Sequence, residues 1–454
     1  MVERDSTTLH SDDLRDIQGL ILLDYNMPLV RHFLLKVERA QEALRFLGAL
    51  ASESALAGLR ITTAADKSAE SCLNIGLTYA GLQALGLPAT ALDSFASTPS
   101  FVAGAAARAW KVGDNDENAP ERWWTDKEKT RPKSSDIHLL LSLYAQYPQE
   151  KNNLGSNRSS DPARKSILDT KATRLKERLR NSLSVVWETD GEELYDRNDP
   201  QSERPGKLIH FDYKDGISQP QIAGAPPAGT AVYPGQETVL PRAFLFGYAS
   251  QWTSFRYPVP RPEQFGRNGS FAVFRVMKQE VDKFAQCPRK TAQRDRISEE
   301  EVAARLCGRK PNGDPLMETR STHINDFDYT SDPKGEVCPF HSHIRRTNPR
   351  GEKIAGADTH QHPIIRGGMP YGPPYDPKNP DAEERGLLGL FIGVSIEDRF
   401  EFIMQNWMNK GGFRQGLPTK SVDPFHPFIM TRGSAYCFLP SINALKYIAA
   451  LPSV

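Results

Sequence analysis

Short apolar runs alternate with stretches of helical periodicity at the start of the chain. RHFLLKV, from residue 31, is a β-like run, and the following AQEALRFLGAL repeats its apolar residues at helical spacing. A second pair comes next, because CLNIGLT at residues 72–78 leads into YAGLQALGLP, where Gly86 and Pro88 supply a helix stop. This part of the chain predicts short elements in the order β-α-β-α.

A strand, a loop and a long helix are predicted next. DIHLLLSLYA at residues 136–145 is an apolar run typical of a strand, and the polar segment 148–161 is rich in turn-forming residues and predicts a surface loop. Asp161 can cap a helix whose first position suits Pro162, and the apolar residues that follow form one stripe. This helix is expected to end near Leu183, with SVVWE as the next strand.

The second half of the chain repeats this pattern. Strand-like runs begin at Gly269 and Gly386, a charged helical stretch lies between them, and a helix is expected from about Glu397. Two similar halves of short mixed elements favour an α+β fold of two ferredoxin-like domains with antiparallel sheets and peripheral helices. The predicted domains are residues 1–225 and 226–454, and no glycine-rich phosphate loop argues for a doubly wound sheet.

The composition limits the kinds of molecule that the protein is expected to bind. Lysine and arginine total 57 against 56 aspartates and glutamates, so no strong field would attract nucleic acid or an anionic membrane, and a small-molecule partner is expected. The first dozen residues lack the apolar stretch of a secretory signal, and no apolar run reaches membrane-spanning length. Five scattered cysteines without a Cys-x-x-Cys pair predict neither a disulfide framework nor a thiolate zinc site. A cytoplasmic location is expected, and secretion of a processed form stays open.

Histidines gather in one short part of the chain. Five of the ten fall within forty residues, in a segment rich in arginine, proline and glycine: His323, His341, His343, His360 and His362. They could be solvated loop residues or ligands of a metal ion. Their intervals do not provide the closely spaced ligand set that zinc usually requires.

Three motifs surround these histidines in a fixed order. They are HFDYKDGISQP at residues 210–220, CPFHSHIRRTNPR at 338–350 and PIIRGGMPYGPPY at 363–375. Together they resemble the dye-decolourising peroxidases, in the longer branch that includes fungal enzymes and their bacterial relatives. DIQGLIL at residues 16–22 and SIEDRFEFIMQNW at 395–407 extend the resemblance over most of the chain.

The resemblance implies a haem site with named residues. His343 corresponds to the proximal iron ligand, although His341 lies only two residues away; Asp215 and Arg366 correspond to the distal pair that activates hydrogen peroxide. One departure is plain, because Asp212 stands where the family's GxxDG pattern begins with glycine. The chemistry agrees with these assignments, since breaking the O–O bond needs a group that moves a proton and a cation that stabilises negative charge.

Carboxylates and guanidiniums near the haem are assigned in the same way. Glu397, with Asp398 as second choice, is expected behind the proximal imidazole, where a carboxylate raises ligand basicity. Arg345 and Arg350 could each pair with a haem propionate, or equally lie on a solvated surface.

Four further residues complete the expected site. Leu388 and Leu390 are expected to contact the haem. Family substrates are often too bulky for the haem pocket, so Tyr375 and Trp407 are candidates for electron transfer at the surface. For Trp407, core packing is the stronger alternative because of its helical spacing with Phe400.

The resulting prediction is a peroxidase with non-covalent haem b, since no Cys-x-x-Cys-His motif binds haem covalently. Its partners would be hydrogen peroxide and aromatic electron donors, and the chain would be a monomer or a homodimer. A haem-binding or haem-handling protein without peroxidase turnover is the alternative, but such a protein has no need for Asp215 and Arg366. A non-haem histidine-cluster metalloprotein is the third candidate.

Overall fold

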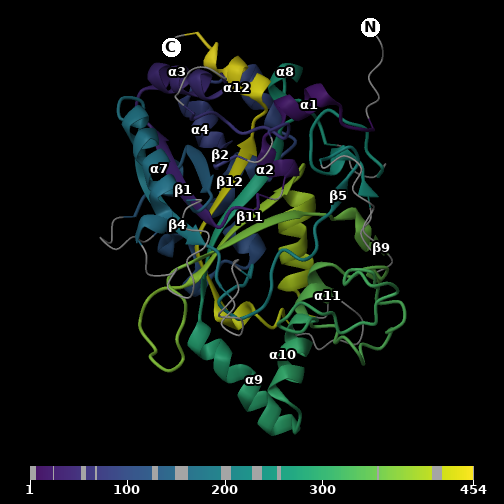
Figure 1. Ribbon diagram of the computed structural model, residues 1–454. Coiled ribbons are helices and arrows are strands. Elements are labelled where there is room, and N and C mark those ends of the chain that lie inside the picture. Colours follow the sequence, from purple (N-terminus) through teal and green to yellow (C-terminus); the bar gives the residue numbers. More distant parts are fainter. Residues whose placement is uncertain are drawn as a thin grey trace.

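A single antiparallel sheet of eight strands organises the molecule (Figure 1). The computed structural model describes residues 7–23, 25–52, 58–66, 69–124, 131–148, 162–195, 206–226, 238–252, 257–354, 357–411 and 422–452. Across the sheet the strands are β10 (Ile365–Tyr371), β11 (Gly386–Gly393), β7 (Ser270–Gln279), β12 (Ile429–Leu439), β2 (Ser71–Leu77), β3 (Leu139–Ala145), β1 (Leu29–Val37) and β4 (Leu183–Glu192).

Each half of the chain contributes four adjacent strands. The N-terminal half has the order β2-β3-β1-β4 and the C-terminal half has β10-β11-β7-β12, which are the same ferredoxin-like arrangement. The halves join where β12 pairs with β2, at Phe438 and Leu77. The predicted α+β class with antiparallel sheets is confirmed, whereas a domain boundary near residue 225 stays a prediction.

Helices cover the outside of the sheet. In the N-terminal half these are α1 (Ser11–Asp16), α2 (Gly19–Leu22), α3 (Ala40–Leu50), α4 (Tyr79–Ala84), α5 (Ala89–Leu92), α6 (Pro99–Arg108) and α7 (Ser166–Leu179). The C-terminal half adds α8 (Glu263–Gly266), α9 (Val281–Asp295), α10 (Glu299–Cys307), α11 (His343–Thr347) and α12 (Ile442–Ala449). Figure 1 shows α9 and α10 extending from the sheet at the end opposite to α3 and α12. No helix in the described part of the chain is long and apolar enough to cross a membrane.

The predicted elements correspond closely to the observed ones. The run at 136–145 forms β3, the helix after Pro162 becomes α7, and SVVWE lies in β4. Most of the predicted loop at 148–161 lies outside the described residues. The helix expected from Glu397 is present, but it consists of two π-helical segments, η11 (Glu397–Glu401) and η12 (Ile403–Met408).

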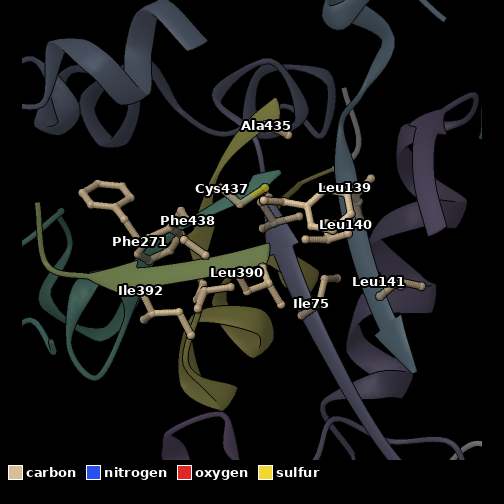
Figure 2. Packing of buried hydrophobic residues seen from close by; sticks show 14 of the residues in the cluster. Ile75, Leu139, Leu140, Leu141, Phe271, Leu390, Ile392, Ala435, Cys437 and Phe438 are labelled. Carbon is tan, nitrogen blue, oxygen red and sulfur yellow. The ribbon is translucent and has the colours of Figure 1, made fainter. Parts of the chain in front are cut away.

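The core joins both halves. Figure 2 shows side chains from β2, β3, β7, β11 and β12 packed together, among them Ile75, Leu140, Phe271 and Leu390. The two edge strands also meet, because a Cβ on Gly191 of β4 would lie 2.5 Å from Cγ of Met369 on β10. The sheet is therefore curled until its edges touch, with one face turned inward between the two halves.

Candidate haem site

A cavity of about 660 Å³ lies against the outward face of the C-terminal strands. Its sheet wall is formed by side chains of four strands, for example Arg275 and Met277 of β7, Phe391 of β11, Arg366 of β10 and Thr431 of β12. Loops and short helices from residues 209–220, 343–350 and 423–426 close the remaining sides. The three sequence motifs around the histidines therefore meet in one place.

His343 is the first residue of α11 and lines this cavity. Its Nδ1 lies 2.8 Å from Oδ2 of Asp423, whose side chain is 1% exposed. Phe425 packs edge-on against the imidazole, with 5.3 Å between ring centres. Because Nδ1 is held by a buried carboxylate, Nε2 is the nitrogen left to bind a metal ion.

His341 does not line the cavity, and burial lowers the pKa of its imidazole. α11 begins at His343, so the two histidines lie in different local structure although only two residues separate them. Among the described residues, no group of three or more histidine, cysteine, aspartate or glutamate side chains is arranged to hold a metal ion.

The carboxylate beside the His343 imidazole is Asp423, so the assignment of that position to Glu397 is wrong. Glu397 instead accepts a hydrogen bond from the backbone nitrogen of Ser100, 2.7 Å away, and so caps α6. Asp398, the second choice, accepts a hydrogen bond from the Ser395 hydroxyl at 3.2 Å. Asp423 is eighty residues from His343 and belongs to no periodic element, so only an Asp-Pro turn signal marked it in the sequence.

Asp215 and Arg366 both line the cavity and lie close to each other. Arg366 Nη1 is 3.9 Å from Asp215 Oδ1, and both side chains are about one third exposed, 36% and 34%. Gln219 fixes the start of β10 through two hydrogen bonds to the backbone of Arg366. Its Oε1 accepts from the Arg366 nitrogen at 3.2 Å, and its Nε2 donates to the Arg366 carbonyl. The pair is thus positioned by one loop and one strand.

Asp212 keeps the turn before Asp215 in the shape that glycine would favour. Its φ is +61°, in the left-handed region, and its backbone nitrogen donates to Ile209 O at 2.9 Å. Aspartate enters this region more readily than most residues with a side chain. The substitution for the family glycine therefore leaves the turn intact.

Glycines make room beside the distal pair. Gly368 of β10 and Gly389 of β11 are cross-strand partners on the cavity face. A Cβ on Gly368 would lie only 2.8 Å from Oδ2 of Asp215, so this carboxylate occupies the space of the missing side chain. Sequence reasoning did not identify this role of Gly368.

Three guanidinium groups face one region of the cavity: Arg309, Arg350 and Arg366. Burial and the neighbouring cations Arg350 and Arg366 lower the pKa of Arg309 to about 10. Arg350 donates to Asn325 O and Ser218 Oγ, at 2.6 and 3.1 Å, rather than to a carboxylate. Such a cluster is suited to an anionic ligand, and Arg309 is a member that sequence reasoning missed.

Arg345 has a different role from the one predicted. Its side chain is 1% exposed, and it forms ion pairs with Asp332 at 2.8 Å and Glu352 at 2.5 Å. It does not line the cavity. The prediction that Arg345 binds a propionate is therefore wrong, because its charge is already neutralised inside the protein.

The two leucines assigned to the haem lie on the opposite face of β11. Leu388 and Leu390 are each 2% exposed and belong to the main core, whereas Leu387, Gly389 and Phe391 line the candidate haem cavity described above. Successive residues of a strand point to opposite faces, so a shift of one residue reverses every assignment. The strand was predicted correctly and its parity was not.

Neither candidate for surface electron transfer is on the surface. Tyr375 is 9% exposed and packs in a small aromatic cluster, with its hydroxyl bonded to Asp282. Trp407 is 4% exposed and lines the cavity from η12. The core-packing alternative for Trp407 is supported, and the most exposed large hydrophobic side chain in the described ranges is Trp110, at 62%.

Comparison with known proteins gives one consistent family. A multifunctional dye peroxidase of Amycolatopsis is 30% identical over 82% of this chain and 81% of its own length. A dye-decolorizing peroxidase of Mycena epipterygia is 27% identical over 96% of this chain and 87% of its own length. The solved structure of an ancestral D-type dye-decolorizing peroxidase, 25% identical, covers 97% of this chain and 99% of its own, with a TM-score of 0.74.

A dye-decolorizing peroxidase solved with 2,6-dimethoxyphenol, 24% identical, has the same fold, with a TM-score of 0.73 over 96% of this chain and 99% of its own. No family model matches the sequence. The relatives include fungal and bacterial proteins, as the motifs had indicated. With its motifs assembled in one cavity and its full-length relatives all peroxidases of one kind, the chain belongs to the dye-decolourising peroxidase family.

Proposed function

We propose that the enzyme is a peroxidase with non-covalently bound haem b, held by His343 and served by Asp215 and Arg366. The observation that carries this proposal is the presence of the His343–Asp423 pair and the Asp215–Arg366 pair in one cavity. The peroxidase activity itself agrees with the named relatives.

The residues present fit a haem. His343 offers Nε2 to iron, because Asp423 fixes the other ring nitrogen. Arg309 and Arg350 would pair with the two propionates, which would bring negative charge beside these two guanidiniums. Bound haem would supply the two electrons that reduce hydrogen peroxide to water.

The protein's part in the reaction is proton transfer and charge stabilisation. Asp215 would take a proton from one oxygen of hydrogen peroxide and deliver it to the other oxygen as the O–O bond breaks. Arg366, 3.9 Å from that carboxylate, would stabilise the negative charge that develops on the departing oxygen. Aromatic donors would then be oxidised one electron at a time, two for each peroxide consumed. A haem carrier would have no use for this pair, so the carrier alternative is disfavoured.

A cytoplasmic location and a monomeric or homodimeric state also remain predictions. Gel filtration of the purified protein would decide the second.

The central experiment is an absorption spectrum of the purified protein before and after one equivalent of hydrogen peroxide. We expect a Soret band that changes on mixing. His343→Ala should lose haem or its five-coordinate spectrum, while His341→Ala, the matched control, should retain both. The opposite result for the two variants would identify His341 as the iron ligand instead.

A further inference from the structure

A second cavity, of about 720 Å³, lies on the inward face of the sheet, and we name it the interior chamber. Leu388 and Leu390 of β11 line it from the C-terminal half, and His32 of β1 and Tyr144 of β3 line it from the N-terminal half. Strand β11 forms part of the wall between the two cavities, because Leu388 and Leu390 point to the face opposite to Gly389 and Phe391, which line only the haem cavity.

The interior chamber and the haem cavity meet at the edge of the sheet. Both are lined by Asp215, Arg366, Gly367 and Gly368. β10 is the edge strand, and its two consecutive glycines place no side chain between the two spaces. A molecule in the interior chamber therefore lies next to the groups that activate peroxide.

His32 is a polar group deep in the chamber, close to the ring of Tyr144. His32 is 2% exposed and its Nδ1 lies 2.9 Å from the Ser142 hydroxyl, which leaves Nε2 for a ligand. Burial lowers the pKa of His32 to about 3, so the imidazole is uncharged under ordinary conditions. The leucines of β11 supply apolar contacts for a ring. Pockets of this size and lining usually bind small, mostly apolar molecules.

Resting on the peroxidase function proposed above, we infer that the interior chamber binds an uncharged monocyclic phenol as electron donor. The ring lies against Leu388 and Leu390, and the hydroxyl bonds to His32. Each phenol loses one electron and one proton and becomes a phenoxyl radical. Two phenols thus supply the two electrons and two protons that convert one hydrogen peroxide into two molecules of water.

The direct test is a crystal of the haem-loaded protein soaked in 4-bromophenol, with the bromine located by anomalous scattering. We expect a bromine peak between Leu390 and His32. A peak confined to the haem cavity would overturn the inference. Because this test uses the natural sequence, it does not depend on the folding of any variant.

Calorimetry tests the hydroxyl contact. His32→Phe keeps a ring of similar size, and it should weaken phenol binding by about three- to tenfold, the usual value of one hydrogen bond. Binding of toluene, which has no hydroxyl, should not change. His362→Phe is the matched control, since His362 lines only the haem cavity. Phenol binding that weakens in His362→Phe and not in His32→Phe would place the phenol elsewhere and contradict the inference.

Failure of the inference and failure of the proposed function are distinguishable. If the chamber contains no bromine and the Soret band still responds to peroxide, the inference that the chamber binds phenol is overturned and the proposed peroxidase function is not. Bromine in the chamber of a protein whose Soret band does not respond overturns the proposed function and leaves the binding site in place.

Discussion

At the scale of single residues, two pairs of side chains define the candidate site. Asp423 holds His343 at 2.8 Å, and Arg366 lies 3.9 Å from Asp215. In the proposed function, the first contact orients the iron ligand and the second brings together a proton carrier and a cation. Substitutions in the two pairs should therefore affect different measurements.

Asp215→Asn and Arg366→Leu should retain haem and react slowly with peroxide. Each substitution removes a group that acts in the transition state and leaves His343 unchanged. Removing such a group usually lowers the rate by about two to four orders of magnitude. Stopped-flow measurement of the Soret change gives this rate. Rates within about threefold of the natural protein in both variants would contradict the assignment, given typical effects of this kind.

Asp423→Asn should weaken haem retention or the peroxide rate by about 10- to 100-fold, the usual effect of removing the partner of a metal-bound histidine. Glu397→Gln is the matched control, because that carboxylate caps α6 and does not contact His343. Haem titration of both apoproteins makes the comparison. A larger effect in Glu397→Gln would restore the sequence-based assignment.

At the scale of elements, strand parity and helix type shape the haem cavity. β11 turns Leu387, Gly389 and Phe391 toward it and directs the residues between them into the core. The π-helical geometry of η11 and η12 brings Phe400 and Trp407 to the same cavity. π-helical turns occur often at functional sites.

Gly368→Ala should slow the reaction with peroxide by about tenfold or more, since a methyl group 2.8 Å from Asp215 Oδ2 must displace this carboxylate. Gly367→Ala is the matched control on the same strand, because its Cβ would have no neighbour closer than 3.8 Å. We expect a much smaller change there. Equal rates for the two variants would show that the position of Asp215 does not depend on Gly368.

At the scale of the whole molecule, curling of the sheet creates two spaces on opposite faces of the same strands. Contact between β4 and β10 closes the inward face, where β1 and β3 of the first half oppose β7 and β11 of the second. His32 is enclosed there, against Phe274 with 4.8 Å between ring centres. Closure of the sheet therefore determines the chemical state of this histidine.

His32 should make the protein sensitive to acid. Its pKa is about 3 in the folded state against about 6.5 for an unperturbed imidazole. Below about pH 6.5 the unfolded chain therefore binds up to one more proton than the folded protein, and stability falls as the pH drops. Between pH 6 and 4 the extra loss approaches about 1.4 kcal/mol per pH unit.

Urea unfolding at several pH values measures this slope at equal haem loading. His32→Phe should flatten it. Ser142→Ala, which removes the same hydrogen bond but leaves the imidazole, should keep it. An unchanged slope in His32→Phe would mean that another group dominates the loss of stability.

The sequence alone determined many of the elements and the candidate residues of the site. Periodicity of apolar residues located β3, α7, β7 and the helix after Glu397, because local spacing follows the geometry of a strand or helix. The three motifs identified His343, Asp215 and Arg366 as the candidate residues, and they all line one cavity.

Only the tertiary structure decided which groups act on one another. Asp423 replaces Glu397 beside His343, Arg345 is neutralised by Asp332 and Glu352, and Tyr375 is buried. Each of these depends on contacts between segments whose approach is set by the packing of the whole sheet, which local sequence does not encode. The face toward which a strand residue points is likewise decided by burial, since the two parities of an apolar strand look alike in sequence.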